Sequence, residues 1–264
     1  MEEHSLRRAL AKLPLGGLRY FEKTTSSNDI ALAWAEEGAP DLALVYAGQQ
    51  TAGRGRSGRR WFTPPGSALA FSLILRPIPG EQQFPARFSG LSALAVCDVL
   101  ERHGLRPEIK WPNDVLLNRR KVCGILVEND WMGEKLETLV LGVGLNIKPA
   151  AVPPPEQLNF PATCLMAELP SSRRRIQRAA LLRQILKSLL DWRGRMAQEV
   201  FLRTWEARLA WRGEMVDVQL DGQASRTGKL DGLELDGSLR LISPQGQPFT
   251  MPFGEVHLRP VANQ

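Results

Sequence analysis

The sequence predicts an α+β protein in which a mixed β-sheet carries helices on one face and is followed by a small C-terminal β-barrel. Several strand-like runs are joined by connections as short as Asn118–Lys121, which cannot form crossovers, so antiparallel pairs are expected. Helical runs lie beside these strands without regular strand–helix alternation. After Trp211 the chain changes to short alternating runs punctuated by Asp-Gly pairs. We therefore expect a large domain over residues 1–209 and a small barrel domain over 210–264.

The first half of the chain contains two helix-like and two strand-like runs. Ser26 or Ser27 suits the N-cap of the first helix, because a serine hydroxyl accepts a hydrogen bond from a free backbone N–H. Small and apolar residues dominate the second helix and indicate that it is buried. The expected elements are a helix over Asn28–Glu37, strands over Leu42–Ala47 and Leu69–Leu75, and a helix over Gly90–His103.

The second half begins with further strands and ends in the barrel. Between them lie an irregular proline-rich segment and a basic helix, which shows one apolar stripe and which we expect to continue past Gly194. The strands are expected over Glu108–Trp111, Gly124–Glu128, Thr138–Val143, Met215–Leu220 and Ser238–Ile242. The other bounds are Pro149–Pro170 for the irregular segment, Arg173–Arg195 with Phe201–Leu209 for the helix, and Asp221-Gly222, Asp231-Gly232 and Asp236-Gly237 for the hairpin turns.

The composition excludes several classes of protein. The chain of 264 residues is 43% hydrophobic, yet no run reaches the length of a membrane span, and Met1–Tyr20 lacks the apolar stretch of a signal peptide. The three cysteines form no C-x-x-C pair, and the three histidines lie far apart, so a structural zinc site is not expected. These features predict a cytoplasmic protein without a membrane partner.

The net charge of +6 suggests an anionic ligand or partner. Much of this charge lies in Arg173–Arg195, where the apolar stripe places most arginines on the solvent face. A basic patch indicates nucleic-acid binding only when a docking motif accompanies it. We therefore interpret this segment as a solvated basic helix and expect the anion site elsewhere.

The loop Gly53–Trp61 reads Gly-Arg-Gly-Arg-Ser-Gly-Arg-Arg-Trp and is the strongest indication of an anion site. Its glycines allow the backbone to approach a ligand closely, and its four arginines suit phosphate or carboxylate oxygens. The glycine spacing also fits the G-x-G-x-x-G dinucleotide fingerprint. That fingerprint requires a helix directly after the loop, however, and Pro64-Pro65-Gly66 prevents one. The loop is therefore expected to hold its anion by another route.

Four separated motifs together resemble the biotin protein ligases, and they occur in that family's order. They are Thr25-Ser26-Ser27-Asn28; Gln50-Thr51-Ala52 with the loop Gly53–Trp61; Lys110-Trp111-Pro112-Asn113-Asp114 running on to Arg120-Lys121-Val122-Cys123-Gly124-Ile125-Leu126-Val127-Glu128; and Gly142-Val143-Gly144-Leu145-Asn146-Ile147. The resemblance implies a class II synthetase-like catalytic domain. It also implies an enzyme that forms biotinyl-5'-AMP from biotin and ATP, releases pyrophosphate, and transfers biotin to a lysine of a biotin carboxyl carrier domain.

The resemblance assigns a role to each motif. The residues matching the family's biotin site are Ser26, Ser27, Asn28, Gln50, Gly53, Gly55, Arg56, Ser57, Lys121 and Gly124. Those on the ATP side are Arg54, Trp61, Lys110, Asn113 and Asn146. Arg56 and Lys121 are expected to offset the repulsion between carboxylate and phosphate, and Asp114 to receive the incoming lysine ammonium. Mg²⁺ is expected to be held through the phosphates, without a protein cage. The family usually has Ser-Thr-Asn where this chain has Ser26-Ser27-Asn28, which keeps the hydroxyl.

Three alternatives stay open at this point. A lipoate or octanoate ligase or transferase would share the fold, although the glycine loop and the Trp-Pro-Asn-Asp run are of the biotin type. A DNA-binding regulator would need a reader domain, and only about 25 residues precede Ser26. A binding module without activity would be expected to lose a motif residue. The sequence leaves open a homodimer and the identity of the carrier protein, for which the family expectation is a subunit of acetyl-CoA carboxylase.

Overall fold

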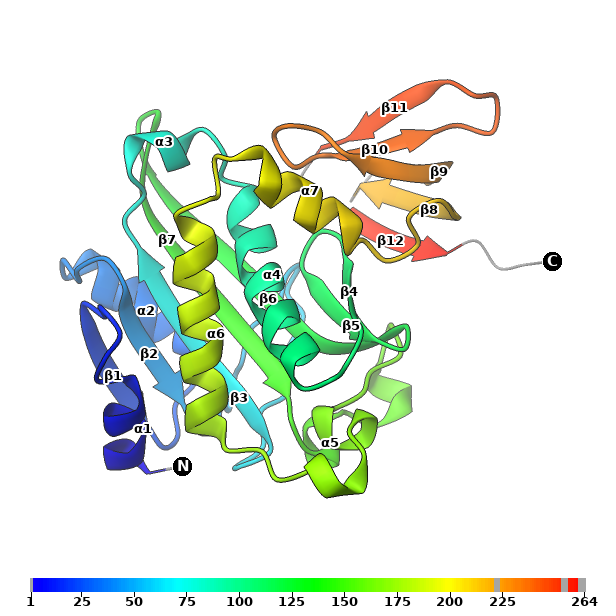
Figure 1. Cartoon of the computed structure of the whole chain (residues 1–264). Helices are drawn as coiled ribbons and strands as arrows, with labels where there is room; N and C mark the ends of the chain where they lie inside the picture. Colours follow the sequence, from blue (N-terminus) through cyan, green and yellow to red (C-terminus); the bar gives the residue numbers. More distant parts are fainter. Residues whose placement is uncertain (1, 221–223, 253–255, 261–264) are drawn as a thin grey trace.

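A seven-stranded mixed sheet forms the centre of the computed structural model, which describes residues 2–220, 224–252 and 256–260 (Figure 1). Its strand order is β1-β2-β3-β7-β6-β5-β4; β1 pairs with β2 in parallel, and the other pairs are antiparallel. The mixed pairing predicted from the short connections is therefore confirmed. The strands are β1 Gly17–Phe21, β2 Ala43–Ala47, β3 Ala68–Leu75, β4 Pro107–Lys110, β5 Asp114–Leu117, β6 Arg120–Met132 and β7 Lys135–Asn146.

Helices cover the sheet on both sides, but unequally. The helices are α1 Glu3–Leu10, α2 Ser27–Glu36, α3 Pro79–Gln82, α4 Arg87–Arg102, α5 Leu165–Glu168, α6 Arg178–Arg193 and α7 Glu199–Ala207, with 3₁₀ turns at Pro149–Ala151, Pro155–Gln157 and Ser171–Arg173. The long helices α4 and α6 pack side by side over one face, as predicted (Figure 1). The exception is α2, which contacts β2, β3 and β7.

Alternation along β3 shows that α2 lies on the opposite face. Leu69, Phe71 and Leu73 belong to the large core that contains the apolar side chains of α4 and α6. Ile74, of the other parity, belongs instead to a small cluster with alanines of α2. Placing all helices on one face was therefore wrong for α2. Its alanines let this helix approach the sheet closely, and that second face is where the candidate site lies.

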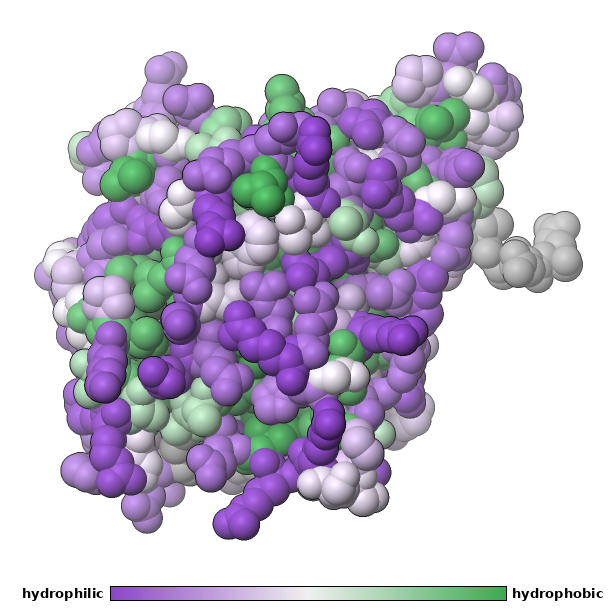
Figure 2. Space-filling model, in the orientation of Figure 1, coloured by the Kyte–Doolittle hydropathy of each residue, from purple (hydrophilic) through white to green (hydrophobic). Residues whose placement is uncertain are grey.

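The basic helix differs from its prediction in length. It begins at Arg178 and ends at Arg193, and α7 is a separate helix, because the chain turns after Gly194. The apolar stripe is confirmed, since Leu182, Ile185, Leu186 and Leu189 are buried. The face of the molecule that carries α6 is largely hydrophilic, with hydrophobic side chains scattered among charged ones (Figure 2). This surface fits a solvated basic helix.

The C-terminal unit is a five-stranded antiparallel sheet whose order, β11-β10-β9-β8-β12, places β11 and β12 at its edges. Asp236-Gly237 is a turn, as predicted, with Gly237 at φ 93°. Asp231-Gly232 lies inside a strand instead of in a turn, and Asp221-Gly222 lies outside the described residues. The strands are β8 Met215–Leu220, β9 Arg226–Leu233, β10 Leu239–Ile242, β11 Pro248–Met251 and β12 Val256–Pro260.

Two polar contacts hold the turn between β9 and β10 against the large sheet. The indole Nε1 of Trp111 donates to the carbonyl of Gly237 at 3.0 Å. The guanidinium of Arg87 donates to the carbonyls of Leu235, at 3.1 Å from Nε, and Met196, at 2.7 Å from Nη1. Trp111 opens the Trp-Pro-Asn-Asp segment, so the C-terminal sheet supports that segment from behind. None of the helices in the described ranges is both long enough and apolar enough to cross a membrane.

Candidate active site

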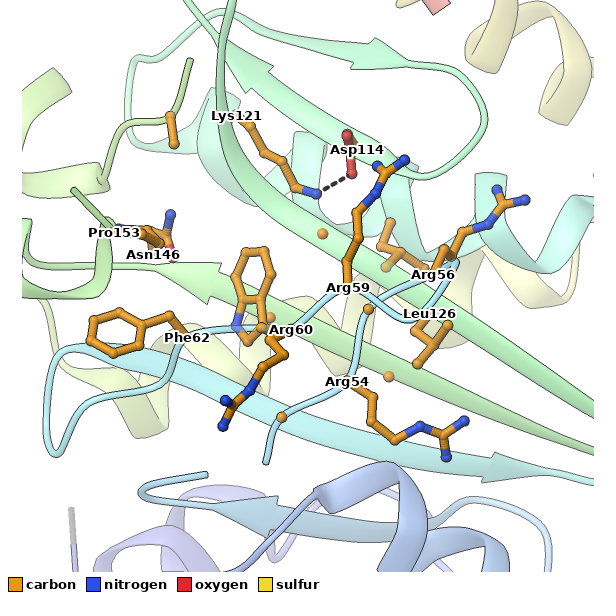
Figure 3. A pocket seen from close by; sticks show the side chains of 18 of the residues that line it. Arg54, Arg56, Arg59, Arg60, Phe62, Asp114, Lys121, Leu126, Asn146 and Pro153 are labelled. Carbon is orange, nitrogen blue, oxygen red and sulfur yellow. Dashed lines mark ion pairs between the residues drawn. The ribbon is translucent and has the colours of Figure 1, made fainter. Parts of the chain in front are cut away.

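A cavity of about 800 Å³ lies on the α2 face of the large sheet, and its walls come from widely separated parts of the chain (Figure 3). This volume falls within the usual range for a small-molecule site. The structure brings every predicted site residue into its lining: Ser26, Ser27, Asn28, Gln50, Gly53, Arg54, Gly55, Arg56, Ser57, Trp61, Lys110, Asn113, Asp114, Lys121, Gly124 and Asn146. The four motifs therefore converge on one place.

Glycines of the central strands form the floor of the cavity. Gly142 and Gly144 alternate on β7 and point to the same face, and Gly124 pairs with Gly144 across from β6. A Cβ atom on Gly142 would lie 2.1 Å from Asn28 Oδ1, and one on Gly144 would lie 2.2 Å from the Trp61 ring. Any other residue there would collide with Asn28 or Trp61, so these glycines are part of the site.

The N-terminus of α2 forms one wall. Ser26 caps the helix by accepting a hydrogen bond from the backbone N–H of Asp29 at 3.4 Å, as the sequence predicted. The backbone N–H of Ser27 donates to Gln50 Oε1 at 2.8 Å, and the hydroxyl oxygens of Ser27 and Ser72 lie 2.8 Å apart, within hydrogen-bond distance. Ser26 and Ser27 are both buried at the cavity edge. This wall therefore presents hydroxyl groups that the strands hold in fixed positions.

The glycine loop folds back on itself as a tight hairpin. Gly55 N–H donates to the carbonyl of Arg59 at 2.7 Å, and Trp61 N–H donates to that of Gly53 at 2.8 Å. Ser57 and Gly58 turn the chain with φ of 54° and 68°. The chain then runs into β3 without a helix, so the dinucleotide fingerprint is excluded, as predicted.

The loop arginines point in different directions. In Figure 3 the side chain of Arg59 extends toward Asp114, whereas those of Arg54, Arg56 and Arg60 extend away from it. Arg60 donates to the carbonyl of Thr51 at 2.9 Å. Arg59, which was not among the predicted residues, is therefore the loop arginine aimed at the buried carboxylate, and the catalytic role of Arg56 stays a prediction.

A buried carboxylate between two lysines forms the most polar part of the cavity. Asp114 Oδ1 lies 2.6 Å from Lys121 Nζ, and its Oδ2 lies 3.5 Å from Lys110 Nζ. Burial raises the pKa of Asp114, but the two lysines outweigh burial and hold that pKa below its ordinary value. Burial lowers the pKa of Lys110, and Asp114 offsets only part of that shift. Two cations thus share one anion, which leaves net positive charge facing the cavity.

The two predicted asparagines are held differently. Asn113 Nδ2 donates to the carbonyl of Ile125 at 2.8 Å, which ties the turn before β5 to β6. Asn146 Nδ2 donates to the carbonyl of Thr163 at 3.1 Å. The Oδ1 of Asn146 is buried without a hydrogen-bond partner among the described residues, so it is an acceptor available to a ligand.

Trp61 lies over the glycine floor. Its ring meets the positions where Cβ atoms of Gly124 and Gly144 would be, and Lys121 Nζ lies 5.4 Å from the ring centroid. The indole Nε1 is buried and has no partner among the described residues. Trp61 therefore offers an aromatic face and a donor inside the cavity, as a residue that stacks on a nucleotide base would, and that role stays a prediction.

Arg259 and Phe160 are two further lining residues that sequence reasoning missed. Arg259 belongs to the C-terminal sheet, and its guanidinium lies 5.2 Å from the centroid of the Phe160 ring, which Lys110 Nζ approaches to 5.3 Å. Burial, and then the charge of Arg59, lower the pKa of Arg259. No local signal marks either residue, because a single arginine in a strand and a phenylalanine in an irregular segment are common. Only the packing of the two sheets brings them here.

Fold and site together place a buried lysine–aspartate cluster and a glycine loop around one cavity, an arrangement that suits an anionic ligand. The model of the Biotin/lipoate A/B protein ligase family matches residues 20–146. A biotin–[acetyl-CoA-carboxylase] ligase of Paracoccus denitrificans is 34% identical over 243 residues, which cover 89% of this chain and 97% of that protein. A bifunctional ligase/repressor of Bacillus subtilis is 34% identical over 235 residues, covering 87% of this chain and 70% of that protein.

The solved structures agree with these relatives. A biotin protein ligase of Aquifex aeolicus, in complex with biotin and ATP, is similar with a TM-score of 0.76 and 26% identity, covering 93% of this chain and 99% of that one. The chain therefore belongs to the biotin/lipoate protein ligase family and, within it, to the biotin protein ligases.

Proposed function

We propose that this chain is an ATP-dependent biotin protein ligase, which makes biotinyl-5'-AMP and passes biotin to the ε-amine of a lysine on a biotin carboxyl carrier protein. The observation that carries the proposal is the Lys121–Asp114–Lys110 cluster, set in the same cavity as the Ser26–Asn28 wall and the glycine floor. One part of the cavity holds fixed hydroxyl groups, and another holds concentrated positive charge. That division suits a ligand with a neutral polar ring and an anionic group.

The biotin end is proposed to lie along α2. A ureido ring needs a few fixed donors and acceptors in an otherwise apolar slot. Ser27 is held by Ser72, and Gln50 is held by Ser27 and, through Nε2, by Thr63 Oγ1 at 3.0 Å. Ser26, Ser27 and Gln50 are therefore proposed as head-group residues. Gly53, Gly55, Ser57 and Gly124 let the ligand approach the backbone.

The activation step joins two anions, so positive charge must lie where they meet. A carboxylate oxygen of biotin attacks the α-phosphorus of ATP, the bond from that phosphorus to the bridging oxygen breaks, and pyrophosphate leaves with the electron pair. Lys121 is proposed to lie at the join, assisted by Arg56 from the loop, with Arg59 as a further cation. Lys110 and Arg259 are proposed to hold phosphate oxygens, and Trp61 to stack on adenine.

Mg²⁺ is proposed to accompany ATP. Among the described residues no group of histidine, cysteine, aspartate or glutamate side chains has the arrangement of a metal cage. The unpartnered Oδ1 of Asn146 fits an oxygen ligand or a partner for metal-bound water. When bound through phosphates, the ion would neutralise charge on the pyrophosphate that leaves.

The transfer step requires a lysine to arrive as an ammonium and to react as an amine. Asp114 is proposed to attract that ammonium and to accept its proton. The amine nitrogen then attacks the acyl carbon, and an amide bond forms as the bond from that carbon to the phosphate oxygen breaks. AMP leaves with the electron pair, and the nitrogen loses its second proton to water. Because Lys121 and Lys110 hold the pKa of Asp114 low, its main contribution at neutral pH is negative charge that orients the ammonium.

A second opening of about 540 Å³ lies between the outer side of the glycine loop and residues 125–128 of β6, beside Asn113. We propose that the carrier lysine enters here.

The cellular setting is proposed to be the cytoplasm, because all three cysteines are free and buried, as a reducing compartment favours. We also propose that the chain acts without binding DNA. The described N-terminal residues belong to the main fold: Leu6 and Leu10 of α1 lie in the core, and β1 pairs with β2.

The deciding experiment is biotin-dependent exchange of labelled pyrophosphate into ATP by the purified protein. Biotin should support exchange, and lipoate or octanoate should not. Exchange with lipoate alone would establish the lipoate-ligase alternative, and no exchange with any acid would refute the proposed activation step. Mass spectrometry of a carrier domain incubated with biotin and ATP then tests transfer.

A further inference from the structure

We infer that Glu128 is a positioning residue that ties the glycine loop to the head-group wall of the cavity. Glu128 lies on β6 at the outer side of the loop, where it lines the second opening but not the main cavity. Its two carboxylate oxygens bind two different partners. One partner is Asn28 at the start of α2, and the other is Arg54 in the loop.

The contact with Asn28 is buried and leaves that side chain little freedom. Asn28 Nδ2 donates to Glu128 Oε2 at 2.8 Å, and Asn28 Oδ1 accepts a hydrogen bond from Ser72 Oγ at 2.5 Å. The amide lies directly against Gly142, and the residue is 4% exposed. Residues of the sheet thus bind both the nitrogen and the oxygen of the Asn28 amide. We therefore assign Asn28 the role of fixing the start of α2, the cavity wall that carries Ser27.

The contact with Arg54 reaches across to the loop. Arg54 Nη2 donates to Glu128 Oε1, and Arg54 Nη1 lies 2.5 Å from Asp29 Oδ1, on α2. The first loop arginine is therefore clamped between carboxylates from two elements. The hydrogen bond with Asp29, and then the charges of Glu128 and Asp29, raise the pKa of Arg54. Arg54 thus serves as the loop's attachment point here, although the sequence placed it on the ATP side.

Glu128 is the residue that contacts both Asn28 and Arg54. The side chain of Glu128 is 21% exposed, whereas those of Arg54 and Asp29 are 42% and 44% exposed. Water screens an exposed pair more strongly than a partly buried one, so the Glu128 contact should hold the loop better than the Asp29 contact. Loss of its charge should release Arg54 and let the loop open more often.

This inference rests on the proposed function for its catalytic consequence but not for its structural one. A loop that opens between the two half-reactions admits water, which hydrolyses an acyl-adenylate. A weakened clamp should therefore increase leakage of the intermediate and raise the KM for biotin, with a smaller change in the kcat of pyrophosphate exchange.

The test uses Glu128→Gln in the full chain. Glutamine has one acceptor oxygen where glutamate has two, so it can serve Asn28 or Arg54 but not both. The matched control is Asp130→Asn, which removes the same charge from the same strand two residues further on. Limited trypsin cleavage within the loop, mapped by mass spectrometry, reports loop opening without any activity. Cleavage should be at least about threefold faster in Glu128→Gln than in wild type. This factor corresponds to a small interaction energy for side chains in contact.

Arg54→Gln breaks the clamp without touching the buried Asn28 contact, and it serves if the first variant folds poorly. Because this change removes the trypsin site at Arg54, cleavage is then compared at Arg56, Arg59 and Arg60. The double variant should leak no more than the single ones, because both remove one interaction. Pyrophosphate release without a carrier domain measures that leak. The inference would be overturned if the loop of Glu128→Gln were cleaved at the same rate as the loops of wild type and Asp130→Asn. It would also be overturned if the leak rates of the two single variants added fully in the double variant. If wild type shows no biotin-dependent exchange while the cleavage pattern holds, the clamp stands and the proposed function fails.

Discussion

The two faces of the large sheet are built from alternate residues of the same strands, and they differ in what they contribute. On β7, Leu139, Leu141, Val143 and Leu145 lie in the core that α4 and α6 share. Between them, Val140 packs under α2, whereas Gly142, Gly144 and Asn146 lie along the cavity. One face is filled with large side chains and the other is kept nearly empty. Period-2 alternation thus separates stability from ligand binding along one strand.

The largest effect on catalysis is expected from Lys121→Met on the cavity face. The change removes the charge 2.6 Å from Asp114 and leaves Lys110 as the one lysine in its ion-pair cluster. Biotin-dependent pyrophosphate exchange should fall by about 10²–10³-fold, the usual effect of losing a positioned electrostatic group. Lys135→Met, on the same sheet but exposed and distant from the cavity, is the control. Equal exchange rates for both variants would remove Lys121 from the activation step.

Gly144→Ala should come next, with a loss of about 10²-fold in kcat/KM, because a Cβ 2.2 Å from Trp61 displaces the indole from the floor. The melting temperature should change little, because the side chain that the methyl group displaces, Trp61, belongs to neither hydrophobic core cluster. The control is Gly80→Ala, where a Cβ would have no neighbour within 4 Å. An active Gly144→Ala enzyme would mean that the floor tolerates side chains.

The pH dependence of ATP binding should give an effect of several-fold. Because burial lowers the pKa of Lys110, this lysine loses its positive charge at a lower pH than an exposed lysine does. The KM for ATP should therefore rise as pH increases from about 7 to about 10. Lys110→Arg keeps its charge throughout this range and should flatten the rise. The same alkaline rise in both proteins would assign the titration to another group.

The smallest effect on catalysis is expected from Leu141→Ala on the packed face, although this change should be costly for the fold. Leu141 is fully buried in the main core, and its truncation should lower the free energy of unfolding by about 2–5 kcal/mol. The KM for biotin should stay near its wild-type value. Urea unfolding measures the first quantity, and exchange kinetics at low temperature measure the second. Leu235→Ala, at an exposed side chain, is the control for stability.

Local signals in the sequence predicted much of the fold. The Ser26 cap, the strands at β2 and β3 and the buried helix α4 follow from capping, strand patterning and apolar periodicity, which depend only on near neighbours. The same reasoning failed where the signal was short or ambiguous. The first helix and strand, α1 and β1, were missed, and so was β5, which begins at the last residue of the Lys110–Asp114 motif. Asp231-Gly232 resembled a turn but lies within β9, because the pairing of Gly232 with Arg240 of β10 overrides the local preference.

The candidate site also has features that the sequence determines and features that only the packing decides. The sequence by itself determined which chemistry is present: a loop rich in arginine, two lysines near an aspartate, and small polar residues at a helix start. Only the tertiary structure decided that α2 lies on the cavity face and that Arg59 rather than Arg56 is aimed at Asp114. It also decided that Glu128 joins Asn28 to Arg54 and that Arg259 reaches the cavity from the second sheet. Side-chain type and spacing are encoded locally. Contacts between residues far apart in the chain depend on how whole elements pack, and no single segment carries that information.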